Sequence, residues 1–382
     1  MSTTVDPSLR HEIAQFGCGD FTQCINCGNC TAVCSLSEGD VVFPRKTIRY
    51  VQLGLRDKLV ASAEPWLCYY CGECTDTCPR QANPGEIMMT VRRWLTAQYD
   101  RSGKAARFYG SNGAMWAAVV QSGLIPAVLL GLYHVATRFE NVVTDRVALN
   151  SFAPVAWVWA IVLIHFAVLG WRVASNAAVM WRSIVPSGGE PTPRPVDYAA
   201  ELGSLAVHFL TQRRWRDCGR EHQGEWLVHW MLVSGYLVML TLVVGLLGWF
   251  QTDAIHPLHH PQRWLGYYAT AALVGASVIM LVGRSRKRAP RYRFSEPSDW
   301  LFPAFLLIGA ITGILVHLFR YAGWPWPTYG MYTVHVMAVV AMLDSEVGVG
   351  KWTHMVYRPW AHFLRSVQKR AQERLAGAGG GS

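Results

Sequence analysis

Charged residues are scarce in this chain of 382 residues. They make up 16% of the sequence, against a usual share of about 25%, whereas hydrophobic residues make up 51%. This imbalance excludes an ordinary soluble protein. The net charge of +10 does not indicate nucleic-acid binding, because most Lys and Arg lie between apolar stretches, where they signal membrane orientation. A secretory signal is also missing, since residues 1–16 contain no apolar core and no small-residue cleavage site.

Cysteine is almost absent beyond residue 80, where Cys218 stands alone. The other nine of the ten cysteines precede it. A cytosolic segment so rich in Cys is more typical of metal binding than of disulfide bonds. Eight of these residues form two copies of the spacing C-x2-C-x2-C-x3-C. The first copy is Cys24, Cys27, Cys30 and Cys34, and the second is Cys68, Cys71, Cys74 and Cys78.

This repeated spacing is that of bacterial ferredoxins with two [4Fe–4S] clusters. The first three Cys of a run bind one cluster, and the fourth binds the other. The predicted ligands are Cys24, Cys27, Cys30 and Cys78 for cluster 1 and Cys68, Cys71, Cys74 and Cys34 for cluster 2. Structural zinc is disfavoured, because zinc sites use pairs of Cys separated by a longer spacer. Cys18 and Cys218 fall outside the pattern and are expected to be buried or free thiols.

Six apolar stretches are long enough to cross a bilayer. They are about 113–137, 152–173, 226–250, 263–283, 299–321 and 329–349. The loops 251–262 and 322–328 contain no Lys or Arg, whereas 174–224, 284–298 and the tail are rich in Arg. The positive-inside rule therefore predicts an inner-membrane protein with both termini in the cytoplasm. Residues 197–215 are expected to form an amphipathic helix at the inner surface.

The expected fold is mostly α, with an N-terminal ferredoxin-like, α-helical, two-cluster domain followed by a six-helix transmembrane bundle. The expected parts are a cytoplasmic iron–sulfur domain (1–105), a transmembrane hairpin (106–175), a cytoplasmic linker with an amphipathic helix (176–224), a four-helix cytochrome b-type membrane domain (225–364) and a cytoplasmic tail (365–382). The final GAGGGS is typical of an appended flexible linker.

Histidines in the apolar stretches are candidate haem ligands, because ionisable side chains in a membrane are costly and usually functional. One such His more often makes a helix–helix hydrogen bond, but the whole set beside two clusters favours b haem. His229 and His354 would hold an inner haem, and His335 and His317 an outer haem. His134 is the alternative to His317 as a ligand of the outer haem, and His165 is the alternative to His229 as a ligand of the inner haem.

A quinone site is expected where a haem approaches the bilayer edge and water. The outer candidates are His256, His259 and His260 with His317 and Arg320. Two alternatives are a loop that is merely interfacial and a site on the inner side near Asp344 and Glu346.

The motifs resemble known redox subunits. The first 100 residues resemble the iron–sulfur C subunit of heterodisulfide reductase. The rest resembles the haem-bearing membrane subunit of that enzyme and the gamma subunit of respiratory nitrate reductase. The motifs that carry this resemblance are His208–Phe209, Cys218, Arg220, His229 and Gly235, then KWTHMVYRP at 351–359. Fusion of the two parts resembles the C subunit of quinone-interacting membrane-bound oxidoreductase (Qmo) complexes.

This resemblance implies electron exchange between menaquinone and adenylylsulfate reductase, with two heterodisulfide reductase A-like flavoproteins as partners. It carries haem ligation over to His354 and His335. The nitrate reductase pattern has a second His ten residues after the first, and here that position is Met239. The partner of His335 must therefore be Met239 or another residue, or the outer haem is absent.

Two alternatives stay open. The chain could be the corresponding subunit of a heterodisulfide reductase or sulfite-reduction membrane complex. It has no CCG-type cysteine motif, so chemistry on sulfur would need another subunit, and quinone would be its own substrate. The alternative of another class is a non-haem membrane transporter or redox sensor, which predicts paired helices broken by Gly or Pro at the midplane.

The spacing of His335 and His354 predicts an irregular helix. They are nineteen residues apart (354 − 335), against eighteen in the nitrate reductase pattern. At 100° per residue, a regular helix would point the two rings about 100° apart. We therefore predict a π-bulge or local unwinding between Asp344 and Trp352, near Gly348 and Gly350.

Overall fold

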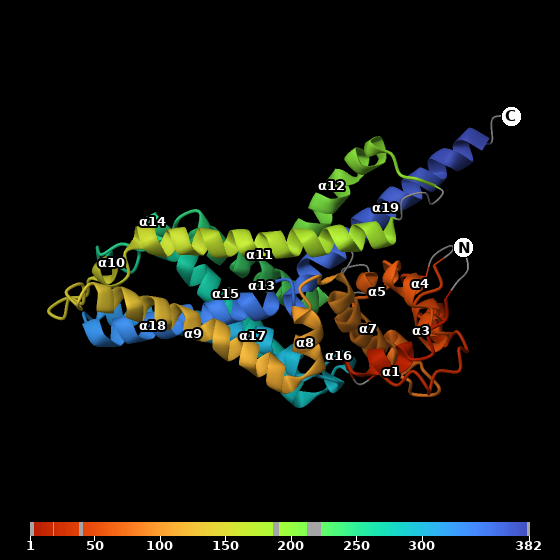
Figure 1. The fold of residues 1–382 in the computed structure, drawn as a ribbon, viewed down its shortest axis with the longest axis horizontal. Coiled ribbons are helices and arrows are strands. Elements are labelled where there is room, and N and C mark those ends of the chain that lie inside the picture. The colour runs from red at the N-terminus through yellow and green to blue at the C-terminus, as the bar shows by residue number, and fades with distance from the viewer. Residues whose placement is uncertain (1–3, 18, 38–40, 186–190, 212–222, 380–382) are drawn as a thin grey trace.

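The computed structural model describes residues 4–17, 19–37, 41–185, 191–211 and 223–379. Within these ranges the regular elements are helices, and no strand occurs. Figure 1 shows short helices gathered at one end of the molecule and long helices that extend from them to the other end. Cys18, Cys218 and Arg220, for which the sequence made predictions, lie outside the described residues.

The N-terminal region consists mainly of short helices around one apolar core. Its helices are α1 (Leu9–Ala14), α2 (Asn29–Ala32), α3 (Arg45–Gln52), α4 (Arg56–Val60), α5 (Glu64–Leu67), α6 (Glu73–Asp76), α7 (Pro84–Tyr99) and α8 (Lys104–Gly110). Fully buried core residues include Ile48 and Trp94. The same core contains Tyr357 and Leu364 of α19 (His354–Gly379). The N-terminal region is therefore packed onto the last long helix rather than attached by a tether.

Five helices are long and apolar enough to cross a membrane by themselves. They are α9 (Asn112–Ala136), α11 (Val155–Ile184), α13 (Gln223–Val244), α15 (Pro261–Arg286) and α17 (Pro297–Tyr321). A sixth span is reached only if α18 (Pro325–Glu346) and the bent continuation Lys351–Ala376 are counted together. This composition is consistent with a multi-pass membrane protein. The six predicted stretches all fall on helices, but α11 continues to Ile184, past its expected end at 173.

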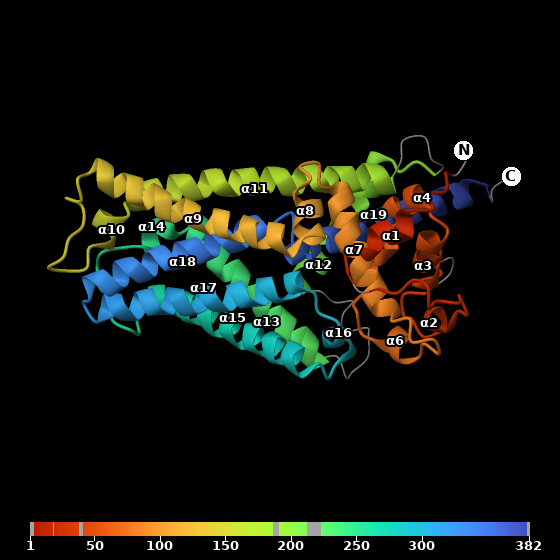
Figure 2. The same ribbon diagram turned by 60° about the horizontal axis from the view of Figure 1, so that its bottom comes forward.

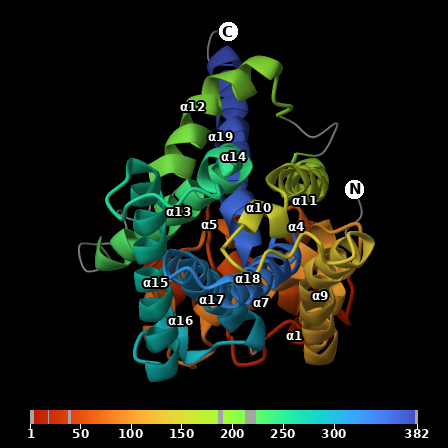
Figure 3. The ribbon, with the colours of Figure 1, turned by 90° about the vertical axis from the view of Figure 1, so that its left-hand side faces the viewer.

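The long helices pack side by side with apolar side chains on their outer faces. Figure 3 shows α17 and α18 between α15 on one side and α9 on the other, and packing contacts join α13 to α15 as well. Large side chains such as Trp157, Ile164 and Trp171 are exposed, Trp171 to 77%. Exposed apolar surface of this extent marks an interaction surface, and on helices of this length it suits lipid.

Both termini lie at the same end of the molecule as the N-terminal region (Figures 1 and 2). The short helices α10 (Leu149–Phe152) and α14 (Leu247–Phe250) lie at the opposite end. The basic 284–298 segment contacts the N-terminal region, where Arg293 lies 3.5 Å from Asp76. The loops predicted to be cytoplasmic and the loops predicted to be outer thus lie at opposite ends. Which end faces the cytoplasm stays a prediction.

The expected amphipathic segment is a helix, α12 (Pro195–Thr211), up to the limit of the described residues. It packs against α19, where Asp197 pairs with Arg374 at 3.0 Å and Glu201 with Arg370 at 2.8 Å. The tail expected from residue 365 is therefore a helix that supports α12. The location of α12 at a membrane surface stays a prediction.

The predicted irregularity before His354 is confirmed as a local unwinding. Helix α18 ends at Glu346, a 3-10 turn follows at Lys351–Thr353, and the chain bends by 62° into α19. Side chains of α11 bond the freed carbonyls: Arg172 donates to Asp344 and Val347, at 3.3 and 3.4 Å, and Asn176 donates to Gly348 at 3.2 Å. The Glu346 carboxylate accepts from the Trp352 N–H at 3.3 Å. Buried backbone groups need such partners, so the break belongs to the fold.

Candidate cofactor sites

The two cysteine runs have the same backbone conformation. Asn26 and Tyr70, which precede the second Cys of each run, both have φ of 57°. Gly28 and Gly72, which follow that Cys, have φ of 96° and 103° and stand at the starts of α2 and α6. Left-handed residues in such a turn aim successive N–H groups at one point, an arrangement found around iron–sulfur centres. The sequence repeat is therefore also a structural repeat.

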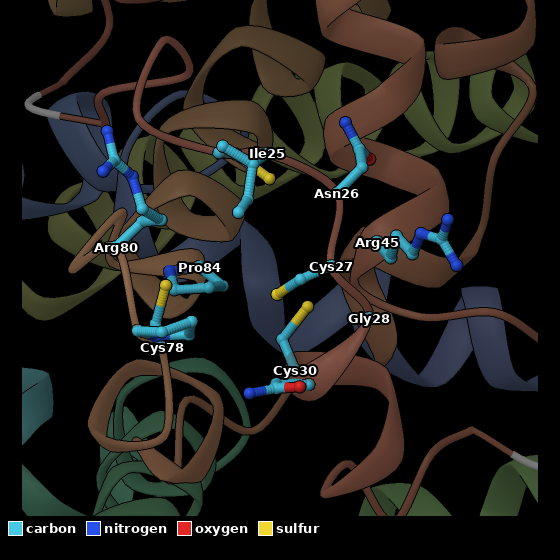
Figure 4. A pocket seen from close by; sticks show the side chains of 12 residues that line it. Ile25, Asn26, Cys27, Gly28, Cys30, Arg45, Cys78, Arg80 and Pro84 are labelled. Atoms are coloured by element: carbon cyan, nitrogen blue, oxygen red, sulfur yellow. The ribbon is translucent and has the colours of Figure 1, made fainter.

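Cysteines from both runs line one pocket. They are Cys24, Cys27 and Cys30 of the first run and Cys78, the last Cys of the second. The pocket holds about 340 Å³ of empty space, part of it open to solvent. Figure 4 shows the sulfurs of Cys27 and Cys30 beside each other, with Cys78 on the facing segment. Four thiols in this arrangement are the donor set that a [4Fe–4S] centre requires.

The remaining four cysteines form a second group. Burial raises the pKa of the Cys34 thiol to about 11, and the nearby Cys68 and Cys71 act in the same direction. Burial also raises the pKa of Cys74, and the nearby Cys68, Cys71 and Cys34 act in the same direction. Buried thiols resist ionisation by themselves, but a coordinated metal deprotonates them. This group therefore also fits a cluster, and Cys34 lies with the second run as the crossed ligand pattern requires.

Backbone N–H groups already point at two of the sulfurs. The Tyr70 N–H donates to the sulfur of Cys68 at 3.3 Å, and the Ala82 N–H donates to that of Cys78 at 3.4 Å. Hydrogen bonds to ligand sulfurs are one of the ways in which a protein sets the reduction potential of a cluster. Each of the two groups therefore has at least one such donor.

Two of the predicted haem ligands face each other. His229 of α13 and His354 at the start of α19 have ring centres 6.0 Å apart, with ring planes inclined at 64°. Two imidazoles on opposite sides of one metal, each about 2 Å from it, would have ring centres roughly 6 Å apart. The Nδ1–H of His354 donates to the Lys351 carbonyl. Because a carbonyl only accepts, this bond fixes the tautomer and leaves Nε2 for a metal. The pair therefore fits a haem.

The predicted outer ligands are not brought together in this way. His335 of α18 shares a hydrogen bond of 3.0 Å with the Thr312 hydroxyl and lies against Gly313, where a Cβ would stand 3.2 Å from its ring. His317 lies one turn after Gly313 on α17 and faces α15. Its Nδ1 lies 3.3 Å from the Arg263 guanidinium, and its Nε2 lies 3.0 Å from the Tyr267 hydroxyl. Each ring thus has its own protein partners.

The two competing histidines have different surroundings. His134 shares a hydrogen bond of 2.8 Å with Asn141, and its ring centre lies 4.5 Å from that of Phe152. It therefore organises the loop after α9. His165 of α11 lies 3.8 Å from the Asp344 carboxylate, beside the break in α18. Neither ring has a ring contact with another His in the described chain.

The outer loop residues predicted to bind quinone have mainly structural contacts. Arg320 is buried and donates to the carbonyls of Thr252 and, at 2.9 Å, Ala254. His260 accepts from the Gln262 N–H at the start of α15 and stacks on His256, with ring centres 4.2 Å apart. His259 is exposed. The guanidinium of Arg320 thus fixes the conformation of this loop.

A buried ionic network was missed from the sequence. Arg93 of α7 bonds Glu86 at 3.2 Å and Asp299 of α17 at 2.7 Å, and Lys351 bonds the other oxygen of Asp299 at 2.7 Å. The Tyr70 hydroxyl donates to Glu86 at 2.8 Å. Burial by itself would lower the pKa of Arg93, but the facing carboxylates outweigh it and raise the pKa.

This network joins the second cysteine run to the turn that carries His354. Tyr70 precedes Cys71 in the second run. Lys351 begins the 3-10 turn, and its backbone carbonyl accepts the hydrogen bond that fixes the His354 ring. The only sequence signals were a Pro-Ser-Asp helix start at 297–299 and the KWTH motif at 351–354. Neither signal reveals a partner some two hundred residues away in the sequence.

Comparison with known families supports the interpretation of the cysteine motifs. A family described as 4Fe-4S dicluster domain matches residues 23–83. A protein of Archaeoglobus profundus, described as like the C subunit of heterodisulfide reductase, is 34% identical over 98 residues, which cover 25% of this chain and 52% of that protein. The N-terminal region is a heterodisulfide reductase C-like iron–sulfur domain.

Two further relatives carry related descriptions. The C subunit of the H(2):CoB-CoM heterodisulfide,ferredoxin reductase of Methanothermobacter thermautotrophicus is 24% identical over 119 residues, 31% of this chain and 60% of that protein. The C subunit of the ferredoxin:CoB-CoM heterodisulfide reductase of Methanosarcina acetivorans is 33% identical over 99 residues, 24% of this chain and 39% of that protein. The chain thus spans between two fifths and three fifths of these relatives. No solved structure matches. A role as a membrane-associated, iron–sulfur electron-transfer subunit of an oxidoreductase follows.

Proposed function

We propose that this chain relays electrons between the menaquinone pool and a cytoplasmic oxidoreductase of sulfur metabolism, adenylylsulfate reductase, with heterodisulfide reductase A-like flavoproteins as partners. The observation that carries the proposal is the position of the His229–His354 pair. His354 begins α19, which packs into the core of the N-terminal region, and that region carries the two four-cysteine groups. This order suits a path from the bilayer to a soluble partner.

In this proposal the eight cysteines hold two [4Fe–4S] clusters. Cys24, Cys27, Cys30 and Cys78 hold cluster 1, and Cys34, Cys68, Cys71 and Cys74 hold cluster 2. Such clusters supply one-electron transfer at a potential set by their surroundings. The chain fixes their positions through the paired left-handed turns at Gly28 and Gly72, and its backbone N–H groups bond the ligand sulfurs.

His229 and His354 are the proposed ligands of an inner b haem. Their spacing and the hydrogen bond from His354 to Lys351 support this assignment. An outer haem on His335 and His317 would require His317 to leave its partners, because Arg263 and Tyr267 engage both of its ring nitrogens. The bond of His335 to Thr312 uses Nδ1 and is compatible with a metal on Nε2. Met239 is the alternative partner of His335. The inner site is therefore the better supported of the two.

The quinone site is proposed on the outer side, near His259, His260 and Arg320, where it would adjoin an outer haem. The bonds of Arg320 to backbone carbonyls leave it little freedom to bind a ligand. The inner alternative has the His165–Asp344 pair and the fully buried Glu346 beside the break in α18. Ionisable groups at such a depth are functional candidates by default.

A second candidate keeps the same cofactors but changes the partner to a heterodisulfide reductase. It is favoured by the descriptions of the relatives, all of which are C or C-like subunits of that enzyme. Co-purification from the native membrane separates the two candidates. Flavoproteins together with adenylylsulfate reductase activity support the first, and a subunit with paired-cysteine catalytic motifs supports the second.

Both candidates require the same cofactors. These are tested by a visible difference spectrum of the purified chain, dithionite-reduced minus air-oxidised. The proposal predicts a b-type haem spectrum together with the broad bleaching of iron–sulfur centres. A spectrum with iron–sulfur absorption and no haem would overturn the relay and favour a redox sensor.

A further inference from the structure

The second cysteine run touches the helix that carries His354. The Arg358 guanidinium lies over the Tyr69 ring, 3.7 Å from its centroid. Tyr69 follows Cys68, and Arg358 stands one turn after His354 on α19. Arg92 of α7 donates a hydrogen bond to the Cys68 carbonyl and so holds the backbone next to Tyr69. Tyr69, next to Cys68, therefore contacts the helix turn that follows His354.

A second contact presses this run against the membrane helices. A Cβ on Gly72 would lie 2.6 Å from Pro290, so only glycine allows the approach. Pro290 begins α16 (Pro290–Arg293), in the connection between α15 and α17. The ionic network from Tyr70 to Lys351 adds a third contact. One side of the second run is thus in contact with the membrane helices.

The first group faces the other way. All twelve residues that line its pocket lie between Cys24 and Pro84, so none comes from the membrane helices. Cys27 is exposed, and the neighbouring Ile25 is 63% exposed. Arg45 and Arg80 line the same pocket, both are exposed, and the lining contains no Asp or Glu. This surface therefore combines the exposed apolar side chain of Ile25 with the two cationic side chains of Arg45 and Arg80.

We infer that the two cysteine groups have fixed and different places in the relay, an inference that rests on the proposed function. The group of Cys34, Cys68, Cys71 and Cys74 exchanges electrons with the membrane part. The group of Cys24, Cys27, Cys30 and Cys78 is the port for the soluble partner, which docks on Ile25, Arg45 and Arg80 with an acidic face around its own flavin or iron–sulfur centre.

The positive charge of Arg45 and Arg80 at the port favours a partner with an acidic surface. Complementary charges raise the rate of encounter and fix the orientation of docking. A partner with acidic residues around its redox centre would be attracted by Arg45 and Arg80 and would bring that centre close to Cys27. Each encounter moves one electron, so that the centre at this group and the centre of the partner change by one oxidation level in opposite directions.

The order of the groups is tested by paramagnetic relaxation in the full chain in detergent. Electron paramagnetic resonance signals of the reduced protein are assigned with Cys27→Ser and Cys71→Ser. A dysprosium–EDTA complex, which stays in water, should broaden the signal that Cys27→Ser removes and leave the signal that Cys71→Ser removes nearly unchanged. Equal broadening of both signals, or the reverse pattern, would overturn the order.

The docking surface is tested with two small oxidants of opposite charge, ferricyanide and hexaammineruthenium(III), by stopped-flow reoxidation of the reduced chain. Arg45→Glu and Arg80→Glu should each slow ferricyanide roughly three-fold or more at low salt and speed the ruthenium complex, because encounter follows the local potential. Arg49→Glu is the matched control, since Arg49 is exposed on the same helix but does not line the pocket.

The control should change both rates much less, and the differences should vanish at high salt. An equal effect of Arg49→Glu would overturn the docking surface. If the reduced wild-type chain gave no iron–sulfur signal, the proposed function would fall and this inference with it. Reversed broadening with both signals present would overturn this inference alone.

Discussion

The two ends of the membrane helices, predicted to be the inner end beside the N-terminal region and the outer end, use histidine in different ways. At the inner end, His229 and His354 face each other at a distance that suits two ligands of one metal. At the outer end, His317 and His335 bond hydroxyl groups and an arginine of neighbouring helices. The inner pair also stands beside the ionic network that reaches the cysteine region. The same residue type thus faces a second imidazole at one end and bonds neighbouring helices at the other.

This difference shows what decides the role of a membrane histidine. The sequence assigns each candidate to one end of the membrane helices, but it does not show which rings face each other. The decisive features are the distance between rings and the partners of each nitrogen. A ring that is held by a backbone carbonyl on one side and faces a second ring on the other is prepared for a metal. A ring with both nitrogens engaged by protein is not.

The largest expected effect is at the inner pair. His229→Ala and His354→Ala should each remove the same haem, because both rings would serve one iron. Haem content measured as pyridine haemochrome should fall by one equivalent in each variant and by no more in the double variant. Additive losses in the double variant would show that the two rings serve different irons.

The next effect concerns the crossed cysteines. Cys78→Ala should damage the site of Cys24, Cys27 and Cys30, because Cys78 lines that pocket although it belongs to the second run. Electron paramagnetic resonance of the reduced variant should lose the same signal as Cys27→Ser, the matched variant. Loss of the signal that Cys71→Ser removes would contradict the crossed arrangement.

The ionic network should be the main stabilising link at the inner end. Arg93→Ala leaves the carboxylates of Glu86 and Asp299 buried with one fewer cation, and such a loss typically costs about 3–5 kcal/mol. The thermal midpoint should fall by several degrees. Arg56→Ala is the control, because its pairs with Asp6 and Glu12 are partly exposed and should contribute little. Equal falls of the thermal midpoint in Arg93→Ala and Arg56→Ala would show that the buried network is not the main stabilising link.

The smallest effect is expected at the outer end. His317→Gln keeps hydrogen-bonding capacity toward Arg263 and Tyr267, so haem content and thermal stability should stay close to those of the wild type. A fall of one haem equivalent would assign His317 to an outer haem and remove the contrast between the two ends.

The sequence predicted the parts whose signals are local. The cysteine spacing predicted which four thiols share a pocket, because the ferredoxin run fixes the path of the chain around a cluster. The count of residues from His335 to His354 predicted a break, and the break lies inside the expected range. The long apolar stretches predicted helices within a few residues, apart from the end of α11 and the stretch 226–250, which is divided into α13 and the short α14.

The parts that depend on distant contacts could not be predicted. The bond between Arg93 and Asp299 spans 206 residues of sequence, and nothing local in either segment points to the other. The sequence predicted the break after α18 but not the side chains that support it. Arg172 and Asn176 of another helix share that task with Glu346. The sixth stretch, predicted over 329–349, ends in the break after α18, and the sequence did not show that the following helix, α19, packs into the core of the N-terminal region.

The central claim is that electrons pass between the membrane and the cysteine groups by way of the inner histidine pair. The most direct measurement adds a reduced menaquinone analogue to the oxidised full chain and follows iron–sulfur signals by rapid-freeze electron paramagnetic resonance. The account predicts that these signals appear in the wild type and fail to appear in His354→Ala, while dithionite still reduces both proteins. Equal appearance of the signals in His354→Ala after addition of the quinol would contradict it.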